Sequence, residues 1–252
     1  MFISGIEKYF FKKAMISKEL IENRINNFLG YGNIDSNIWF VCMEEGFAGE
    51  LEDLKPRFKA TKDSLVVDIC DDMTDVPDHI RYFLGERPPI QRTWSKLITM
   101  LLAFEEQSVT TEIVREYQKT RFGRRDSNHC ILDLMPLPSS SIRELDWVYF
   151  NFKIDYLMTR GVYFQEVMPM RIKLYQKYIS KHRPTTVIFC SFMYLPHWIE
   201  IAKCQFKKSE GFHYCKKEGI NYFVIPHPMA HGISNAEWIR MANEIKVLSK
   251  ME

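Results

Sequence analysis

The sequence predicts an α/β protein of three layers, in which helices cover both faces of a central, mostly parallel four-stranded sheet. Two observations support this fold class. Apolar runs of strand length begin near residues 38, 130, 186 and 222. Longer segments with helical spacing separate these runs, and strands that alternate with helices favour a parallel sheet.

The four strands are predicted from local patterns. In residues 38–43, Ile38, Trp39, Phe40 and Val41 follow one another without a polar residue. The other three strands are expected in HCILDLMPLPSS (129–140), which ends in a proline loop, in RPTTVIFCSF (183–192) and in NYFVIPHP (221–228). The segment SLVVDICDD (64–72) is ambiguous, and we expect at most a short strand and an acidic loop there.

Helices are predicted from apolar residues that recur every three or four positions. Residues 4–28 predict one or two helices that end near GYGN (30–33), and TWSKLITMLLAFEE (93–106) gives the clearest helical pattern. The last helix is expected over residues 235–250, with Asn235 as its N-cap. Further helices are expected in ELEDLKPRF (50–58), in residues 164–182 after Pro169, and in LPHWIEIAKCQF (195–206).

Length and composition indicate an ordinary globular protein. The 252 residues fit a single domain, with a helical extension over residues 1–30 and a core over residues 35–250. The net charge of +2 gives no strong overall field, so binding of nucleic acid requires a local basic patch. Six cysteines without a C-x-x-C pair indicate reduced thiols and a cytoplasmic location. No apolar run reaches membrane length, so we expect no membrane partner, and we expect a monomer.

Five polar side chains follow the ends of the predicted strands: Glu44, Glu45, Asp133, Ser191 and His227. Ligand sites of parallel sheets lie beyond the carboxyl ends of the strands, so these residues are expected to converge. A carboxylate and a histidine across a cleft suit a reaction that separates charge, such as cleavage of an N-glycosidic bond. The carboxylate stabilises a sugar cation or orients water, and the histidine hydrogen-bonds the departing base.

Two segments resemble motifs of the uracil-DNA glycosylase superfamily. CMEEG (42–46) is similar to the motif that ends the first strand of that family, and Glu44 falls where the family has its catalytic Asp or Asn. IPHPMAHGIS (225–234) is similar to the last motif, with His227 and Pro228 in place. Asp133 falls near a base-reading Asn, and TWSKLITML (93–101) resembles a helix between the motifs.

The resemblance implies a monofunctional DNA glycosylase that flips a base out of the stack and requires no metal or organic cofactor. Glu44 and His227 are then the catalytic pair. The base contacts are expected from Asp133, Phe47, Met43, Glu45 and Ser191. The DNA contacts are expected from Met229, His231 and Ser234, in or near the family's inserting loop, and from the basic cluster Arg121, Arg124 and Arg125.

The sequence departs from the family pattern at three positions. The catalytic position is Glu44, the usual proline is Glu45, and the base-reading Asn is Asp133. An ionised carboxylate only accepts hydrogen bonds, so Asp133 would favour a base edge that offers an amino group. A modified or cytosine-like base is therefore expected rather than uracil, and a role in repair or in defence against bacteriophage would fit.

Each residue also has a purely structural interpretation. Glu44, Glu45 and Asp133 are consistent with carboxylates at turns, His227 with a strand cap, and Phe47 with a residue that covers a loop. Met229 and His231 are consistent with an exposed turn, and the arginines with a solvated loop. Two rival functions remain open: a nucleic-acid-binding module that has lost the chemistry, and a metal-dependent hydrolase that uses Glu44, Glu45, Asp133, His227 and His231.

Overall fold

The computed structural model describes residues 16–47 and 51–250, and an eight-stranded sheet in the order β3-β1-β4-β2-β5-β8-β7-β6 forms its centre. The strands are β1 (Gly30–Gly32), β2 (Ile38–Gly46), β3 (Val66–Val67), β4 (His129–Ser139), β5 (Thr186–Cys190), β6 (Lys207–Lys208), β7 (His213–Lys217) and β8 (Ile220–Ile225).

The four predicted strands are confirmed as β2, β4, β5 and β8. They are neighbours in the order β4-β2-β5-β8, and all three pairings between them are parallel. The prediction of a four-stranded sheet is nevertheless wrong, because two strands extend each side of this group. Since β1 is antiparallel to β4 and β7 is antiparallel to β8, the sheet is mixed.

The added strands have weak sequence signals. β1 is the tripeptide Gly30-Tyr31-Gly32, which was expected to end a helix, and glycine is depleted in strands. Both glycines permit a close approach to β4, because a Cβ on Gly30 would lie 2.1 Å from the main-chain oxygen of Ile131 and one on Gly32 would lie 2.7 Å from that of His129. The close packing of β1 against β4, rather than strand propensity, therefore explains why glycines occupy this strand.

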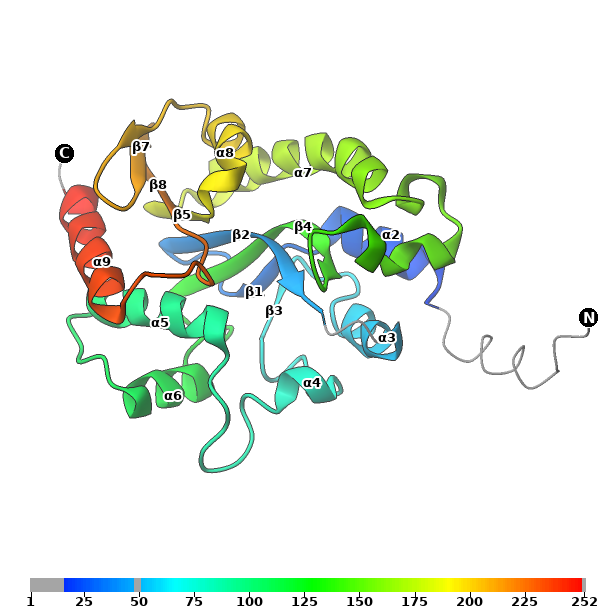
Figure 1. Cartoon of the computed structure of the whole chain (residues 1–252), viewed down its shortest axis with the longest axis horizontal. Coiled ribbons are helices and arrows are strands. Elements are labelled where there is room, and N and C mark those ends of the chain that lie inside the picture. Colours follow the sequence, from blue (N-terminus) through cyan, green and yellow to red (C-terminus); the bar gives the residue numbers. More distant parts are fainter. Residues whose placement is uncertain (1–15, 48–50, 251–252) are drawn as a thin grey trace, which may run out of the picture.

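Helices cover both faces of the sheet, as the three-layer prediction required. One apolar core lies under α2, α3, α7 and α8, and a second lies under α5, α6 and α9. Figure 1 shows α7 and α8 on one side of the sheet and α5 and α6 on the other. The helices are α2 (Lys18–Asn27), α3 (Leu51–Ala60), α4 (Pro77–Ile80), α5 (Arg92–Phe104), α6 (Thr111–Thr120), α7 (Arg160–His182), α8 (Leu195–Ala202) and α9 (Asn235–Lys250), with 3-10 turns η1 (Glu144–Asp146), η2 (Val148–Phe152), η3 (Asp155–Leu157) and η4 (Phe192–Tyr194).

The strands belong to both cores because successive side chains of a strand point to opposite faces. In β2, Trp39 and Val41 pack in the core under α7, whereas Phe40 between them packs in the core under α5. This double burial explains why the parallel strands are continuous apolar runs in the sequence.

Two helix boundaries differ from the prediction. α7 begins at Arg160, with the Thr159 hydroxyl accepting from the main-chain N–H of Val162, so Pro169 lies inside the helix instead of before it. In α9 the cap is Ser234 rather than Asn235, because the Ser234 hydroxyl accepts from the N–H of Glu237 and the Glu237 carboxylate accepts from the N–H of Ser234. The predicted N-terminal helical region, residues 4–28, contains α2, and its residues 4–15 lie outside the described residues.

In the part of the chain that the structure describes, no helix has the length and apolar character needed to cross a membrane.

Candidate functional site

A cleft of about 490 Å³ opens at the carboxyl ends of β2, β4, β5 and β8, where the sequence predicted a site. It brings together seven of the predicted residues: Met43, Glu44, Glu45, Asp133, Ser191, His227 and Met229. Ser191 and His227 follow β5 and β8 as predicted. The prediction is wrong for Glu44, Glu45 and Asp133, which lie within β2 and β4, because these two strands continue past the residues where their apolar runs stop.

Glu44 is held by one arginine. Its Oε1 accepts from Nη2 of Arg160, at the start of α7, at 2.5 Å. Burial raises the pKa of Glu44 above its usual value, although Arg160 opposes this shift by its charge and its hydrogen bond. The second oxygen of Glu44, Oε2, is buried without a hydrogen-bond partner among the described residues. A buried acceptor of this kind in a cleft wall is suited to a bound water or ligand.

Glu45 lies beside Glu44 but has much stronger partners. Its carboxylate accepts from Arg24 at 2.9 Å and from the Tyr31 hydroxyl at 2.6 Å, and it forms an ion pair with Arg57 at 3.1 Å. Burial alone would raise the pKa of Glu45, but Arg57, Arg24 and the Tyr31 hydroxyl outweigh it and lower that pKa. Glu45 is therefore an ionised anchor between β2, α2 and α3, even though it lines the cleft.

Asp133 is the third carboxyl group of the cleft, and its side chain has no hydrogen-bond partner among residues 16–47 and 51–250. It lies opposite Cys42 in the β2–β4 ladder and is only 7% exposed. Burial raises the pKa of Asp133 well above its usual value, and the charges of Glu45 and Glu44 raise it further against the effect of Arg24 and Arg171. The raised pKa favours the protonated form of Asp133, which can donate one hydrogen bond and accept others.

His227 lies at the rim, just after β8. Its Nδ1 accepts from the main-chain N–H of Met229 at 3.1 Å, and partial burial lowers the pKa of its imidazole. A backbone N–H is always the donor, so in the neutral ring the proton is on Nε2. His227 therefore offers one N–H donor beyond the end of β8.

Ser191 follows β5 in a backbone conformation that residues other than glycine rarely adopt, with φ +84°. Its main chain is fixed on both sides, because its N–H donates to the Ile225 oxygen and its own oxygen accepts from Nε1 of Trp198, each at 2.9 Å. Strain that is held in this way is common where a side chain must be aimed into a site. The Ser191 hydroxyl already accepts from the N–H of Met193 at 3.3 Å.

Cys42 forms part of the cleft lining but has an inert thiol. A hydrogen bond with the neighbouring Cys190 thiol, together with burial, raises the pKa of Cys42 well above its usual value. Because only a thiolate is a good nucleophile, Cys42 is poorly suited to covalent catalysis.

Six predicted contacts are not part of the cleft lining. Phe47 is buried in the core under α3 and α7, and Ser234 caps α9. His231 is exposed in the loop between β8 and α9. The other three are the arginines of the basic cluster.

Those arginines lie before the amino end of β4, whereas the cleft opens at the carboxyl ends of the strands. Arg121 binds Glu105, Arg124 binds Asp68 and Asp71, and Arg125 binds Asp72. The acidic loop that follows β3 thus neutralises the basic loop that precedes β4.

Three residues of the site had no functional prediction. Trp94, at the start of α5, and Tyr194, in η4, line the cleft and provide aromatic surface beside the polar groups. Arg160 reaches Glu44 from a position 116 residues further along the chain. Trp94 was assigned only to the apolar side of a helix, and nothing local in the sequence signals that Arg160 would meet Glu44.

The described residues contain no group of three or more His, Cys, Asp or Glu side chains arranged to hold a metal ion. The carboxylates of Glu44 and Glu45 are instead occupied by arginines.

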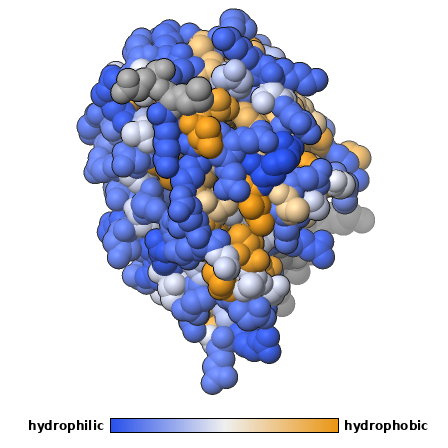
Figure 2. All heavy atoms as spheres, turned by 90° about the vertical axis from the view of Figure 1, so that its left-hand side faces the viewer, coloured by the Kyte–Doolittle hydropathy of each residue, from blue (hydrophilic) through white to orange (hydrophobic). Residues whose placement is uncertain are grey.

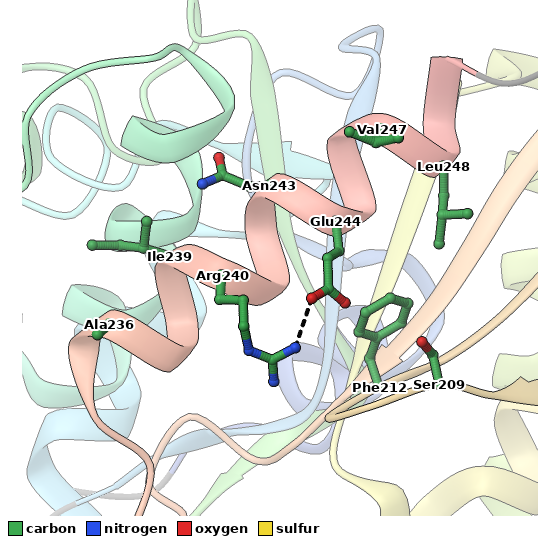
Figure 3. A pocket seen from close by; sticks show the side chains of 9 residues that line it. All are labelled: Ser209, Phe212, Ala236, Ile239, Arg240, Asn243, Glu244, Val247 and Leu248. Carbon is green, nitrogen blue, oxygen red and sulfur yellow. Dashed lines mark hydrogen bonds and ion pairs between the residues drawn. The ribbon is translucent and has the colours of Figure 1, made fainter.

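A larger hollow of about 670 Å³ lies elsewhere, between α9 and residues 209–212. Figure 2 shows this side of the molecule, where apolar atoms form a broken strip among hydrophilic ones. Figure 3 shows Arg240 and Glu244, one turn apart on α9, bound to each other at 2.6 Å. Since its two charged groups pair with each other and most other lining residues are apolar, this hollow offers less chemistry than the cleft.

Comparison with protein-family models and with curated proteins finds no match for this chain, so the case for a function rests on the chemistry of the cleft.

Proposed function

We propose that the protein is a DNA glycosylase, which accepts a flipped base in the cleft and hydrolyses its N-glycosidic bond. One observation carries this proposal. A carboxylate with a free oxygen (Glu44), a buried carboxyl group (Asp133) and an imidazole whose Nδ1 is already bound (His227) share one cleft. These are the groups needed to activate water, read a base and stabilise a departing anion.

In the proposed reaction, the bond between the sugar C1′ and the base nitrogen breaks, and the base leaves with the electron pair. The Nε2–H of His227 stabilises the negative charge on the base, while the sugar acquires oxocarbenium character. Water attacks C1′, and the Glu44 carboxylate accepts its proton, which leaves an abasic site. Trp94 and Tyr194 offer ring faces on which an unstacked base can lie.

Asp133 is proposed to read the edge of the base. When protonated, it pairs either with an acceptor and an amino group side by side, as in cytosine, or with a ring N–H beside a carbonyl, as in uracil. Because burial favours the protonated form, uracil joins the cytosine-like bases as a candidate substrate. Modified cytosines and uracil both belong in a substrate panel.

An abasic-site assay tests this function. The protein is incubated in EDTA with DNAs that carry uracil, hypoxanthine or modified cytosines, including glucosylated ones, and alkali then cleaves the strand at abasic sites. We expect product from one substrate, and a loss of about 10²-fold or more in Glu44→Gln, with DNA affinity retained. Full activity of Glu44→Gln would remove Glu44 from the mechanism.

A second candidate function is a binding module that recognises a flipped base without cleaving its bond. The hydrogen-bonded ion pair between Arg160 and Glu44 favours the binding module, because a carboxylate bound by an arginine is a weaker base for activating water. Tight binding to a modified DNA with no abasic product on the whole panel would support this alternative against the glycosylase.

A further inference from the structure

A second hollow of about 430 Å³ adjoins the cleft, and we name it the arginine groove. Arg81, Tyr82 and Arg92 belong to its lining, and it shares Gln91, Thr93 and Met229 with the cleft. The shared residues form a rim over which a chain molecule can pass from one hollow into the other.

The two arginines of the groove have no ion pair with any described carboxylate. Arg81 donates to the Tyr82 hydroxyl at 3.2 Å, and its guanidinium lies over the Tyr82 ring, 5.0 Å from the centroid. Arg92 is the first residue of α5, where the helix dipole adds partial positive charge.

This pattern is the reverse of the one found at the predicted basic cluster. Arg121 and Arg124 are each bound to carboxylates on neighbouring loops, and Arg125 is bound to Asp72. The arginine groove therefore has positive charge that is available to a ligand, whereas the predicted cluster has little.

We propose that the arginine groove binds the phosphodiester backbone of the nucleic-acid strand beside the unit that enters the cleft. Such a strand carries a negative charge at every link, so a neighbour of the inserted unit brings a phosphate across the rim. Arg81 and Arg92 then each contact a phosphate, while the Tyr82 ring supports the Arg81 guanidinium. The choice of nucleic acid as the occupant rests on the proposed function, while the charge and position of the groove do not.

The test uses Arg81→Gln/Arg92→Gln in the full chain. Binding of a fluorescent single-stranded oligonucleotide is measured by anisotropy at several salt concentrations. Two lost phosphate contacts predict a weaker affinity at low salt and a plot of log K against log salt that is shallower by about 1.4. Lys173→Gln/Lys181→Gln, which removes the same charge from two exposed positions on α7, is expected to keep the wild-type slope.

Arg81→Lys/Arg92→Lys keeps the two positive charges and is expected to restore most of the slope of log K against log salt. This variant therefore distinguishes the loss of charge from structural damage. Equal slopes for the wild type and Arg81→Gln/Arg92→Gln would overturn the proposal. If the slope falls as expected but the wild type yields no abasic product, the groove stands and the glycosylase fails. If the wild type yields product and the slope is unchanged, the groove is wrong and the glycosylase stands.

Discussion

Asp133 shares its cleft with Glu44 and Glu45, but the three carboxyl groups have different partners. Glu45 is bound by two arginines and a tyrosine, Glu44 by one arginine, and the Asp133 side chain by no described residue. Their pKa values diverge accordingly, lowered for Glu45 and raised for Glu44 and Asp133. Carboxyl groups whose pKa values differ in this way can take different roles in one site.

Asp133→Asn is expected to be more stable than the wild type, by a margin that grows with pH. The pKa of Asp133 is higher in the folded chain than in the unfolded chain. Between those two values the folded state holds the extra proton, so the free energy of unfolding of the wild type falls as pH rises, by up to about 1.4 kcal/mol per pH unit. The amide does not titrate, so the variant escapes this loss.

Urea unfolding of both proteins, at several pH values from about 5 to about 8, measures this margin. A margin that stays constant over the range would show that Asp133 is already ionised in the folded protein.

Arg160→Gln is expected to shift the acid limb of the pH–rate profile for base release to higher pH. Burial already raises the pKa of Glu44, and the variant removes the charge that opposes this effect. Each further pKa unit would lower the rate about tenfold at pH values below the pKa, with recovery at high pH. Arg143→Gln, which breaks an exposed pair with Asp146, serves as the control, and an unchanged profile in Arg160→Gln would contradict the role given to Glu44.

At the scale of elements, Glu45 joins three parts of the fold. Arg24 comes from α2 and Arg57 from α3, and Glu45 itself lies near the end of β2. Arg57 also donates to the main-chain oxygen of Gly46 at 3.2 Å, and Arg24 to that of Pro136 in β4 at 2.8 Å. These bonds fix the position of the strand end that carries Glu44.

Glu45→Ala is expected to lower the free energy of unfolding by about 3–5 kcal/mol, because it leaves two buried guanidinium groups without their carboxylate. Glu44→Gln is the matched comparison. It leaves one buried guanidinium without a carboxylate instead of two and keeps an acceptor oxygen for it, so a smaller loss than in Glu45→Ala is expected. Chemical denaturation measures both values, and equal losses would show that the two neighbours do not have separate roles.

The sequence predicted most elements with a local pattern, but it missed α6, although Thr110 caps this helix and Val114 and Tyr117 are three residues apart on its buried side. The strands β2, β4, β5 and β8 were predicted because burial on both faces leaves continuous apolar runs. The strand at Gly30–Gly32 was missed because its place in the sheet depends on close approach to β4. Within the site, His227 follows its strand as predicted, but Glu44 lies inside β2 and Asp133 in the middle of β4. No local pattern predicts which carboxylate meets Arg160 or the Arg24–Arg57 pair.

At the scale of the whole molecule, the rival metal-dependent hydrolase lacks a ligand set. Over residues 16–47 and 51–250, no three His, Cys, Asp or Glu side chains are arranged to hold one metal ion, although Glu44, Glu45, Asp133 and His227 all line the cleft. The carboxylate of Glu45 would have to leave two arginines before it could bind a cation.

We therefore expect base release to proceed at the same rate with and without EDTA. The abasic-site assay, run before and after dialysis against chelator and with Mg²⁺ or Mn²⁺ added back, measures this. Loss of activity in EDTA with recovery on addition of a metal would favour the hydrolase.

The sheet ends in two very short strands, β3 on one side and β6 on the other, each of two residues. β6 consists of Lys207 and Lys208, and both side chains are exposed. A long, flat, apolar edge would invite pairing with another chain, whereas a short edge with charged lysines repels it. Both edges of the sheet thus resist the edge-to-edge strand pairing from which protein fibrils grow.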